Sequence, residues 1–376
     1  MADQMVDCAA GPGVQPTSSL RRMTAPPPLS ELTTLRLGGP PQRLVEARSE
    51  DELAAIVREA DAAGEPLLVL AGGSNVVVAD EGFAGSVVRV ATRGIEQLRR
   101  SDGRVWLDVQ AGEDWDALVA MCVDGGLAGI EALSGIPGSV GATPIQNVGA
   151  YGQEVADVLA GVRALDRSTG EVHLLEVEEC LFDYRSSVFK RDPDRWLVLG
   201  VIFALEPGDS EPVRYTELAR RLGIAEGATA PLQDVRAAVL ELRRGKGMVL
   251  DAADPDTVSA GSFFTNPILR GHAFAELAER AAERLGSDVV PPSWPASDHR
   301  YVKTSAAWLI ERAGFMRGYG NPGGIAISSK HTLALTNRGN GTTRELVALA
   351  REIAGGVREA FGVELVPEPV FVGHAW

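Results

Sequence analysis

The stretch Ser134–Gly152 reads SGIPGSVGATPIQNVGAYG, and it says more about the fold than any other part of the sequence. Glycine recurs throughout it, at Gly135, Gly138, Gly141, Gly149 and Gly152. Ordering a glycine-rich backbone costs more entropy than ordering other residues. Its N–H groups can approach a phosphate closely because no side chains intervene. The stretch therefore predicts a ligand site made of backbone, or a tightly packed turn, and does not by itself identify the ligand.

A second glycine turn precedes it, in the segment Ala71–Val78, which reads AGGSNVVV. Taken alone, Gly72–Asn75 is a common turn. The sequence contains neither GxxxxGK[ST] nor a GxGxxG turn that opens a helix with an acidic residue farther on, so nothing supports a Rossmann dinucleotide site.

Composition narrows the class of protein. The chain has 376 residues, 45% of them hydrophobic, and a net charge of −15. An acidic chain is a poor ligand for nucleic acid, and no apolar run approaches the ~20 residues of a membrane helix. Cys8, Cys122 and Cys180 are widely spaced and the histidines are scattered, which disfavours a disulfide framework or a metal site. We expect a cytoplasmic monomer without nucleic-acid partner, membrane insertion or metal.

Local patterns predict an α+β chain. Ser49 and Glu52 form a capping box that begins a helix, and Thr342 and Glu345 form another. Further helices are expected at 115–123, from Pro231, and at 274–285 and 305–313. Strands are expected at 67–70, continued by 76–78 after the glycine turn, and at 87–90 and 105–109. An antiparallel group is expected from 162–165, 172–177 and 196–205.

The two glycine turns together resemble a known signature. AGGSN followed by GIPGSVGATPIQNVGAYG is similar to the FAD-binding signature of the UDP-N-acetylenolpyruvoylglucosamine reductase family, which has the vanillyl-alcohol-oxidase/PCMH flavoprotein fold. The likeness runs from Thr33 to Phe371. It implies FAD and NADPH as cofactor and co-substrate. Because no histidine precedes His173, we expect the FAD to be bound non-covalently.

The resemblance also implies a division of the chain and a set of FAD-binding residues. Residues 31–92 and 93–248 would form a two-module FAD-binding domain, and residues 249–367 an α+β substrate-binding domain. A strand within 368–376 would return to the first module. Residues 1–30 are expected to be a flexible tail from their composition, because they hold Gly, Pro, Ser and Thr with little periodicity. The FAD-binding residues would be Gly72, Gly73, Ser74, Asn75, Ser134, Gly135, Ile136, Pro137, Gly138, Ser139, Gly141, Gly149 and Arg243.

The implied reaction has two halves. NADPH reduces FAD, and the reduced flavin reduces UDP-N-acetylglucosamine enolpyruvate to UDP-N-acetylmuramate for peptidoglycan synthesis. The second half needs a cation on the enolpyruvyl carboxylate and a proton donor at C2.

The resemblance assigns the cation to Arg185, in Tyr184–Lys190 (YRSSVFK). Arginine suits this role because its planar fork can donate two parallel hydrogen bonds. Without the resemblance, Arg185 is a surface arginine.

Two further residues complete the implied catalytic set. Ser262, in Ala260–Pro267 (AGSFFTNP), matches the family's proton donor, although alone it would be a turn or cap serine. Glu368 lies between Pro367 and Pro369 and matches a glutamate that polarises the enolate. Here the sequence departs from the more familiar Glu-Pro-Glu, because Val366 replaces the first glutamate. The second glutamate is the matching one, so the assignment survives.

Four residues are implied to bind the substrate: Tyr151, Tyr215, Lys246 and Asn266. The tyrosine in VRYTEL is similar to that of a subtype which closes a tyrosine-bearing loop over the substrate. Without the resemblance, Arg243 and Lys246 would be a solvated helix face. Two other hypotheses stay open from sequence: another FAD-dependent oxidase or dehydrogenase of the same fold, and a non-catalytic sugar-nucleotide-binding protein.

Overall fold

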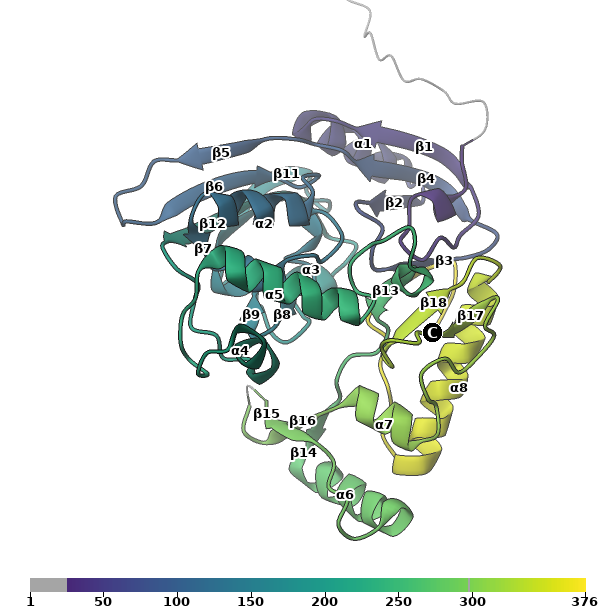
Figure 1. Cartoon of the computed structure of the whole chain (residues 1–376). Coiled ribbons are helices and arrows are strands. Elements are labelled where there is room, and N and C mark those ends of the chain that lie inside the picture. The colour runs from purple at the N-terminus through teal and green to yellow at the C-terminus, as the bar shows by residue number, and fades with distance from the viewer. Residues whose placement is uncertain (1–25, 297) are drawn as a thin grey trace, which may run out of the picture.

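The computed structural model describes residues 26–296 and 298–376, so most of the predicted tail lies outside the described residues. It is an α+β structure, as predicted (Figure 1). Its helices are α1 (Glu50–Ala63), α2 (Trp115–Asp124), α3 (Val188–Arg191), α4 (Thr216–Leu222), α5 (Leu232–Gly245), α6 (Gly271–Leu285), α7 (Ala306–Arg312) and α8 (Thr343–Phe361). No helix in the described part of the chain is long and apolar enough to cross a membrane.

The first sheet is parallel and has the strand order β1 (Pro41–Ala47), β4 (Phe83–Val90), β2 (Leu67–Leu70). Helix α1 packs on it and begins as predicted, because the Ser49 hydroxyl accepts the backbone N–H of Glu52 at 3.2 Å. The sequence did not predict β1. It begins with proline and carries two charged residues, so its propensity is weak, and its pairing with β4 outweighs that weakness.

The second sheet is the antiparallel group that the sequence predicts, extended at one edge. Its order is β11 (Glu171–Leu175), β10 (Leu159–Asp166), β12 (Trp196–Pro207), β6 (Val105–Gln110), β5 (Ile95–Leu98). Strand β7 (Leu127–Ala128) pairs with the end of β12. The long strand β12 is buried along most of its length, and α2 packs in the same core through Trp115, which is fully buried.

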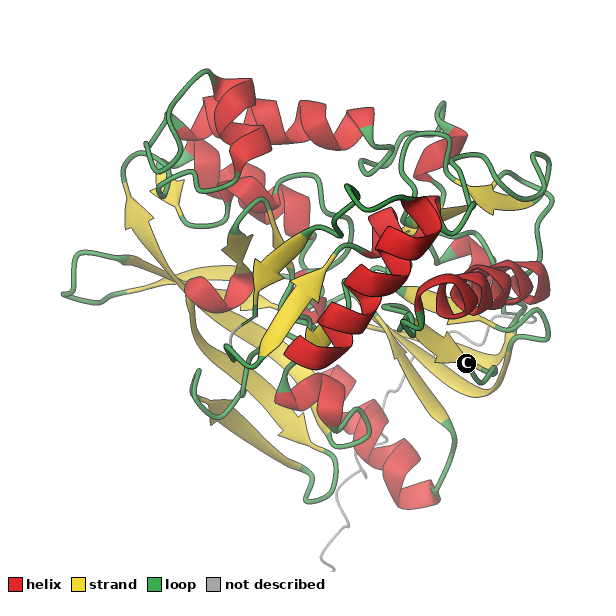
Figure 2. Cartoon of the chain, turned by 90° about the horizontal axis from the view of Figure 1, so that it is seen from below, coloured by secondary structure: helices red, strands yellow, loops and turns green. Residues whose placement is uncertain are grey.

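The third region contains two small antiparallel sheets. One has the order β13 (Ser259–Ser262), β18 (Ala334–Asn337), β17 (Ile325–Ile327), and α8 packs against it. The other has the order β14 (Ile268–Arg270), β16 (Tyr301–Thr304), β15 (Ser293–Pro295), and lies with α6 and α7 at the bottom of Figure 1. The predicted capping box of α8 is present at Thr342 and Glu345. Figure 2 shows the same helices and sheets from below.

Strand β19 (Val370–Val372) pairs in parallel with β3 (Val76–Val78). This corrects the expectation that residues 76–78 continue the strand 67–70. The turn at Gly72–Asn75 redirects the chain, so β2 and β3 belong to different sheets. A short hairpin, β8 (Gly149–Ala150) and β9 (Gln153–Glu154), follows the glycine-rich stretch. The module boundaries drawn from the sequence stay a prediction.

Candidate functional site

The two glycine turns pack directly against each other. A Cβ atom on Gly72 would lie 2.6 Å from the Cα of Gly138 and 3.2 Å from the backbone nitrogen of Ser139. Gly138 has a φ of +131°, and a Cβ there would lie 2.8 Å from the hydroxyl of Ser74. Only glycine allows two backbones to approach this closely. Segments from two distant parts of the sequence therefore form one backbone surface, which we call the glycine cradle (residues 72–75 and 134–139).

Two buried polar atoms beside this cradle have no hydrogen-bond partner: the hydroxyl of Ser139 and Nε of Arg243. Buried polar groups are nearly always bonded, so unpartnered ones need an explanation. Arg243 also donates to the carbonyls of Met248 at 2.9 Å and Gly135 at 3.4 Å, and burial lowers its pKa. A buried guanidinium and a free hydroxyl at a glycine surface suit an anionic ligand such as a diphosphate.

Other residues of the glycine-rich stretch serve the protein's own packing. The hydroxyl of Ser134 donates to the carbonyl of Glu131 at 2.7 Å, so it is already satisfied. Gly141 packs on Ala111, where a Cβ would lie 2.5 Å from the alanine Cβ. A Cβ on Gly149 would lie 3.1 Å from a guanidinium nitrogen of Arg185. The stretch thus combines ligand contacts with close packing of backbone.

A cluster of charged and amide side chains lies at the cradle. Arg185 and Glu368 form an ion pair, with 3.3 Å between Nε and Oε1. Gln146 donates to the same Oε1 at 3.2 Å, and Asn75 donates to Gln146 at 3.0 Å and to the carbonyl of Glu368 at 3.3 Å. The structure therefore brings together Arg185 and Glu368, which the sequence proposed as catalytic. Gln146 was missed, although it lies within the quoted glycine-rich stretch.

The electrostatics of this cluster are those of a buried site. The Glu368 side chain is 13% exposed. Burial raises the pKa of Glu368, and the nearby Arg185 and Lys190 oppose that rise. Burial also lowers the pKa of Lys190, whose ammonium donates to the carbonyl of Arg185 at 3.1 Å. Lys190 was not proposed from the sequence, although it ends the motif YRSSVFK. Perturbed pKa values in one cluster are typical of functional sites.

Ser262 is half-buried at the end of β13 and pairs with Ala334 of β18. The next residue, Phe263, accepts the backbone N–H of Glu368 at its carbonyl, at 2.8 Å. Phe264 forms a bridge with Pro367. The segments that carry Ser262 and Glu368 therefore run side by side.

Three of the four predicted substrate-binding residues form a second group, and Asn266 does not. The rings of Tyr151 and Tyr215 meet edge to face, with centroids 5.4 Å apart. The ammonium of Lys246 lies 5.7 Å from the centre of the Tyr151 ring and pairs with Glu217 at 2.7 Å. Asn266 has other contacts: its carbonyl oxygen accepts the backbone N–H of Ala306 at 3.0 Å, at the start of α7.

Strained backbone marks both groups. Asn147, Tyr151 and Arg185 have φ values of 44°, 51° and 51°, a region that residues other than glycine seldom occupy. Such strain persists only where the surroundings enforce it, and it is common at ligand sites.

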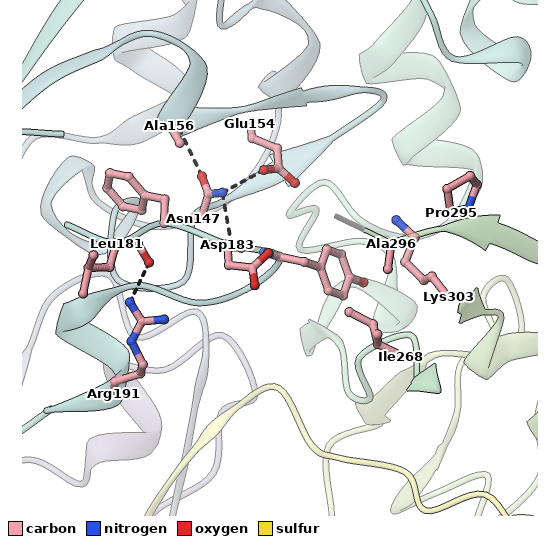
Figure 3. Close-up of a pocket in the computed structure, with 12 residues that line it drawn as sticks. Asn147, Glu154, Ala156, Leu181, Asp183, Arg191, Ile268, Pro295, Ala296 and Lys303 are labelled. Carbon is pink, nitrogen blue, oxygen red and sulfur yellow. Dashed lines mark hydrogen bonds between the residues drawn. The ribbon is translucent and has the colours of Figure 1, made fainter. Parts of the chain in front are cut away.

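A cavity of about 730 Å³ is lined by Tyr184, the residue before Arg185, and by Asn147, whose carbonyl binds Arg185. Figure 3 shows Asn147, Glu154 and Asp183 on one side of it and Lys303 across from them. Burial raises the pKa of Glu154, and Arg185 opposes that rise. The sequence did not point to these residues, although Asn147 lies within the quoted glycine-rich stretch and Asp183 directly precedes the motif YRSSVFK. The full lining is Asn147, Glu154, Ala156, Leu181, Phe182, Asp183, Tyr184, Arg191, Ile268, Pro295, Ala296 and Lys303.

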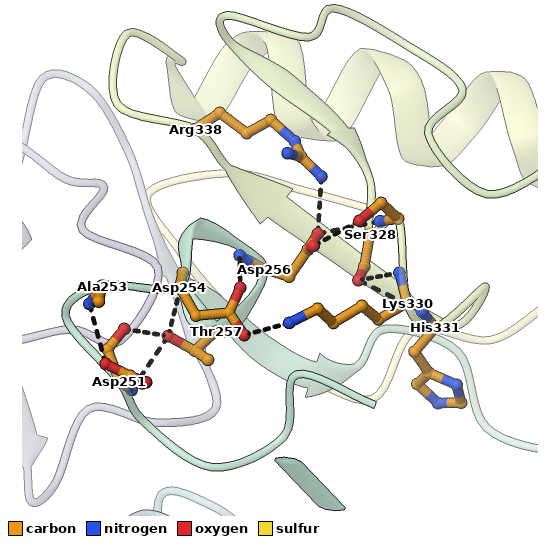
Figure 4. A network of polar contacts seen from close by, with 10 residues as sticks. Asp251, Ala253, Asp254, Asp256, Thr257, Ser328, Lys330, His331 and Arg338 are labelled. Carbon is orange, nitrogen blue, oxygen red and sulfur yellow. Dashed lines mark hydrogen bonds and ion pairs between the residues drawn. The ribbon is translucent and has the colours of Figure 1, made fainter. Parts of the chain in front are cut away.

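A polar network supports the strand that carries Ser262. Asp256 lies just before β13 and pairs with Arg338 at 2.6 Å, while its other oxygen accepts the Ser329 hydroxyl at 2.6 Å (Figure 4). Lys330 pairs with Asp254 at 2.6 Å. The network joins the segment that enters β13 to the loop between β17 and β18, which carries His331.

Comparisons with known proteins agree with this geometry. A family model described as an FAD binding domain matches residues 41–176, and one described as the UDP-N-acetylenolpyruvoylglucosamine reductase C-terminal domain matches residues 254–372. UDP-N-acetylenolpyruvoylglucosamine reductase of Thermobifida fusca is 57% identical over 347 residues, which cover 92% of this chain and 97% of the relative. The one from Streptomyces coelicolor is 57% identical over 350 residues, covering 93% and 90%.

A solved structure of a similar protein has the same fold. The crystal structure of UDP-N-acetylenolpyruvylglucosamine reductase from Thermus caldophilus is 25% identical and matches with a TM-score of 0.61, over 94% of this chain and 98% of that one. These matches confirm the predicted flavoprotein fold and FAD as the cofactor, which the glycine cradle and its two unpartnered polar atoms fit. The chain belongs to the UDP-N-acetylenolpyruvoylglucosamine reductase family.

Proposed function

We propose that the protein uses NADPH to reduce UDP-N-acetylglucosamine enolpyruvate to UDP-N-acetylmuramate, a step of peptidoglycan precursor synthesis. The observation that carries this proposal is the position of Glu368. Its side chain binds Gln146 of one glycine-rich segment and Arg185, while its backbone carbonyl binds Asn75 of the other. The proposed catalytic carboxylate is thus attached to both segments of the FAD site.

The proposed FAD site uses the residues named from the sequence. The backbone of Gly72–Asn75 and of residues 134–139 would face the diphosphate, with the Ser139 hydroxyl and the Arg243 guanidinium as donors. When bound, FAD supplies the hydride chemistry that no side chain can perform. The protein's part is to hold the substrate, exclude water and move one proton.

Arg185 is the proposed ligand of the enolpyruvyl carboxylate. Negative charge spreads into that carboxylate as hydride arrives at C3, so a fixed cation there stabilises the transition state more than the ground state. The guanidinium is held by the carbonyl of Asn147 at 3.1 Å and by Glu368 at 3.3 Å. Its orientation is therefore set before substrate binds.

Ser262 is the proposed proton donor to C2. A serine hydroxyl is a weak acid, but a carbanion-like carbon is a much stronger base than water. Glu368, on the adjacent segment, would orient donors around the enolate. Burial raises the pKa of Glu368, so this carboxyl group takes up a proton more readily than an exposed glutamate does. A raised pKa suits a group that exchanges protons during catalysis.

The tyrosine-loop subtype is also a proposal. Tyr151, Tyr215 and Lys246 lie together, and Tyr215 is 43% exposed just before α4. Two hydroxyl donors and an ammonium suit the substrate's diphosphate. Asn266 lies beside Tyr184, with which it forms a hydrogen bond, and would act from there.

We further propose that the protein works in the cytoplasm as a monomer, without nucleic-acid partners, and that it is divided at residues 31–92, 93–248, 249–367 and 368–376. The net charge of −15 supports the lack of a polyanionic partner. The pairing of β19 with β3 supports the return of the last segment to the first module.

The test separates the two half-reactions. Purified holoprotein is mixed anaerobically with NADPH and then with the enolpyruvyl sugar nucleotide, while the flavin absorbance is followed. Bleaching and then recovery is the expected result. Recovery by oxygen alone, with none by the sugar nucleotide, would favour an oxidase of the same fold, and no bleaching would favour a non-catalytic binder.

A variant tests the role of the proposed proton donor. Ser262→Ala should leave bleaching by NADPH intact and strongly slow recovery by the sugar nucleotide. Equal loss of both half-reactions would make Ser262 structural.

A further inference from the structure

Four aromatic rings pack behind the segments that carry Ser262 and Glu368. They belong to Phe263 and Phe264, which follow Ser262, to Phe371 of β19, and to Trp376. The indole of Trp376 lies 6.4 Å from the Phe263 ring, 5.9 Å from the Phe264 ring and 5.7 Å from the Phe371 ring, between centroids. Trp376 therefore contacts both segments at once, and we call these four rings the aromatic cluster.

The approach of Trp376 to the cluster is held by the backbone around it. The carbonyl of Val372 accepts the backbone N–H of Ala79 at 2.9 Å. The chain then turns at Gly373, whose φ is +76° and where a Cβ would lie 2.8 Å from the Cβ of Ala79. Beyond the turn, Arg351 of α8 donates to the carbonyl of Ala375 at 2.9 Å. The indole is thus placed by a turn and an anchor, although 41% of its surface is exposed.

The two segments share few backbone hydrogen bonds near the site. Glu368 N–H donates to Phe263 at 2.8 Å, and Thr265 N–H donates to Val366 at 3.0 Å. The prolines on both sides of Glu368 have no N–H to contribute. Side-chain packing must therefore supply much of the stiffness of this pairing. The Phe263 ring meets the rings of Phe264 and Phe371 edge to face. Trp376 meets Phe264 edge to face and lies at a tilt against Phe263 and Phe371, so it braces the contact between the two segments.

We propose that Trp376 is a positioning residue, which sets the spacing between Ser262 and Glu368 by joining their segments through the aromatic cluster. This rests on the roles proposed above for those two residues. Proton transfer is sensitive to sub-ångström changes in geometry. In the proposed mechanism neither residue takes part in hydride transfer from NADPH, so a loss of Trp376 should affect only the second half-reaction.

The variants are Trp376→Ala, Trp376→Phe and, as a matched control, Trp106→Ala. Trp106 lies on β6 and also has a ring contact, with Arg100 at 5.0 Å. In Trp376→Ala we expect recovery of the flavin by the sugar nucleotide to slow about tenfold, with FAD content and the rate of bleaching by NADPH unchanged. Trp376→Phe should restore most of the rate, and Trp106→Ala should match the wild type. Equal recovery in Trp376→Ala, or equal loss in both half-reactions, overturns the proposal.

A second measurement does not depend on the reaction. Hydrogen exchange of the peptide that contains Glu368 should accelerate in Trp376→Ala and not in Trp106→Ala, because the N–H of Glu368 loses the packing that protects its bond to Phe263. Unchanged exchange would overturn the positioning role even if activity falls. A wild-type protein that the sugar nucleotide cannot reoxidise would instead overturn the proposed function itself.

Discussion

The glycine cradle and the cluster around Glu368 lie side by side but are made in opposite ways. The cradle is backbone: Gly72 and Gly138 approach so closely that a Cβ would lie 2.6 Å from a main-chain atom. The cluster is side chains: a carboxylate, a guanidinium, an ammonium and two amides come from segments as far apart as 293 residues. A site made of backbone should lose its ligand when atoms are added to it. A site made of side chains should lose its function when the charge or length of a side chain is changed.

The largest effect should follow from adding one carbon to the cradle. In Gly72→Ala the Cβ would force the two glycine turns apart, since main chain cannot yield as a flexible side chain can. We expect the protein to be purified without yellow colour and to bind added FAD more than about 100-fold more weakly. The control is Gly355→Ala in α8, where a Cβ meets nothing within 4 Å; a colourless control would mean that the loss is not specific to the cradle.

The next effect tests the side-chain cluster without changing its shape. Glu368→Gln keeps the size of the side chain but removes its charge and its capacity for proton chemistry. We expect flavin recovery by the sugar nucleotide to slow by about 10³-fold, within the range for loss of a general acid–base group, while NADPH still bleaches the flavin. Loss of bleaching would instead assign Glu368 to holding the cofactor.

A third prediction concerns His331, close to the cations that flank the cradle. Burial and then Lys246 and Arg317 lower its pKa from 6.5 to about 4. Between pH 6.5 and pH 4 the unfolded chain therefore binds a proton that the folded chain excludes, so stability from this group is present above pH 6.5 and is lost as the pH falls toward 4. The loss should be about 3 kcal/mol. Denaturant unfolding of His331→Gln should show a smaller decline than the wild type over that window; parallel declines would contradict it.

The smallest effect should come from Ser139, whose side chain is a proposed donor in a site made mainly of backbone. In Ser139→Ala the hydroxyl that has no partner is removed. Because an unsatisfied buried group costs stability, the FAD-free protein should be as stable as the wild type or up to about 1 kcal/mol more stable. FAD affinity should fall about tenfold, as expected for one lost hydrogen bond. Titration of apoprotein with FAD measures this, and unchanged affinity would show that the hydroxyl does not reach the ligand.

The sequence could predict the glycine cradle better than the side-chain cluster around Glu368. The glycines of the cradle can be read from two short stretches of sequence, each local, although the packing of one against the other cannot. The caps at Ser49 and Thr342 are local too. Gln146 could not be recognised as a member of the cluster, because its partners Asn75 and Glu368 come from other segments. Lys190 binds Arg185 within its own motif, but its proximity to Glu368 depends on the fold. The weak strand β1 and the separation of β2 from β3 were missed for the same reason: the pairing with β4 and β19 decides them.

The parallel pairing of β19 with β3 has a consequence for how the molecule folds. Contacts between such distant segments form slowly, since the loop that they close must first lose its freedom. The glycine cradle and Arg243, which binds Gly135, all precede the third region of the chain, so the proposed diphosphate site can be assembled before the last segment docks. Glu368 is added only when β19 docks. During refolding, therefore, the ability to bind the cofactor should return before the ability to reduce a substrate, with the interval between them reporting the docking of β19.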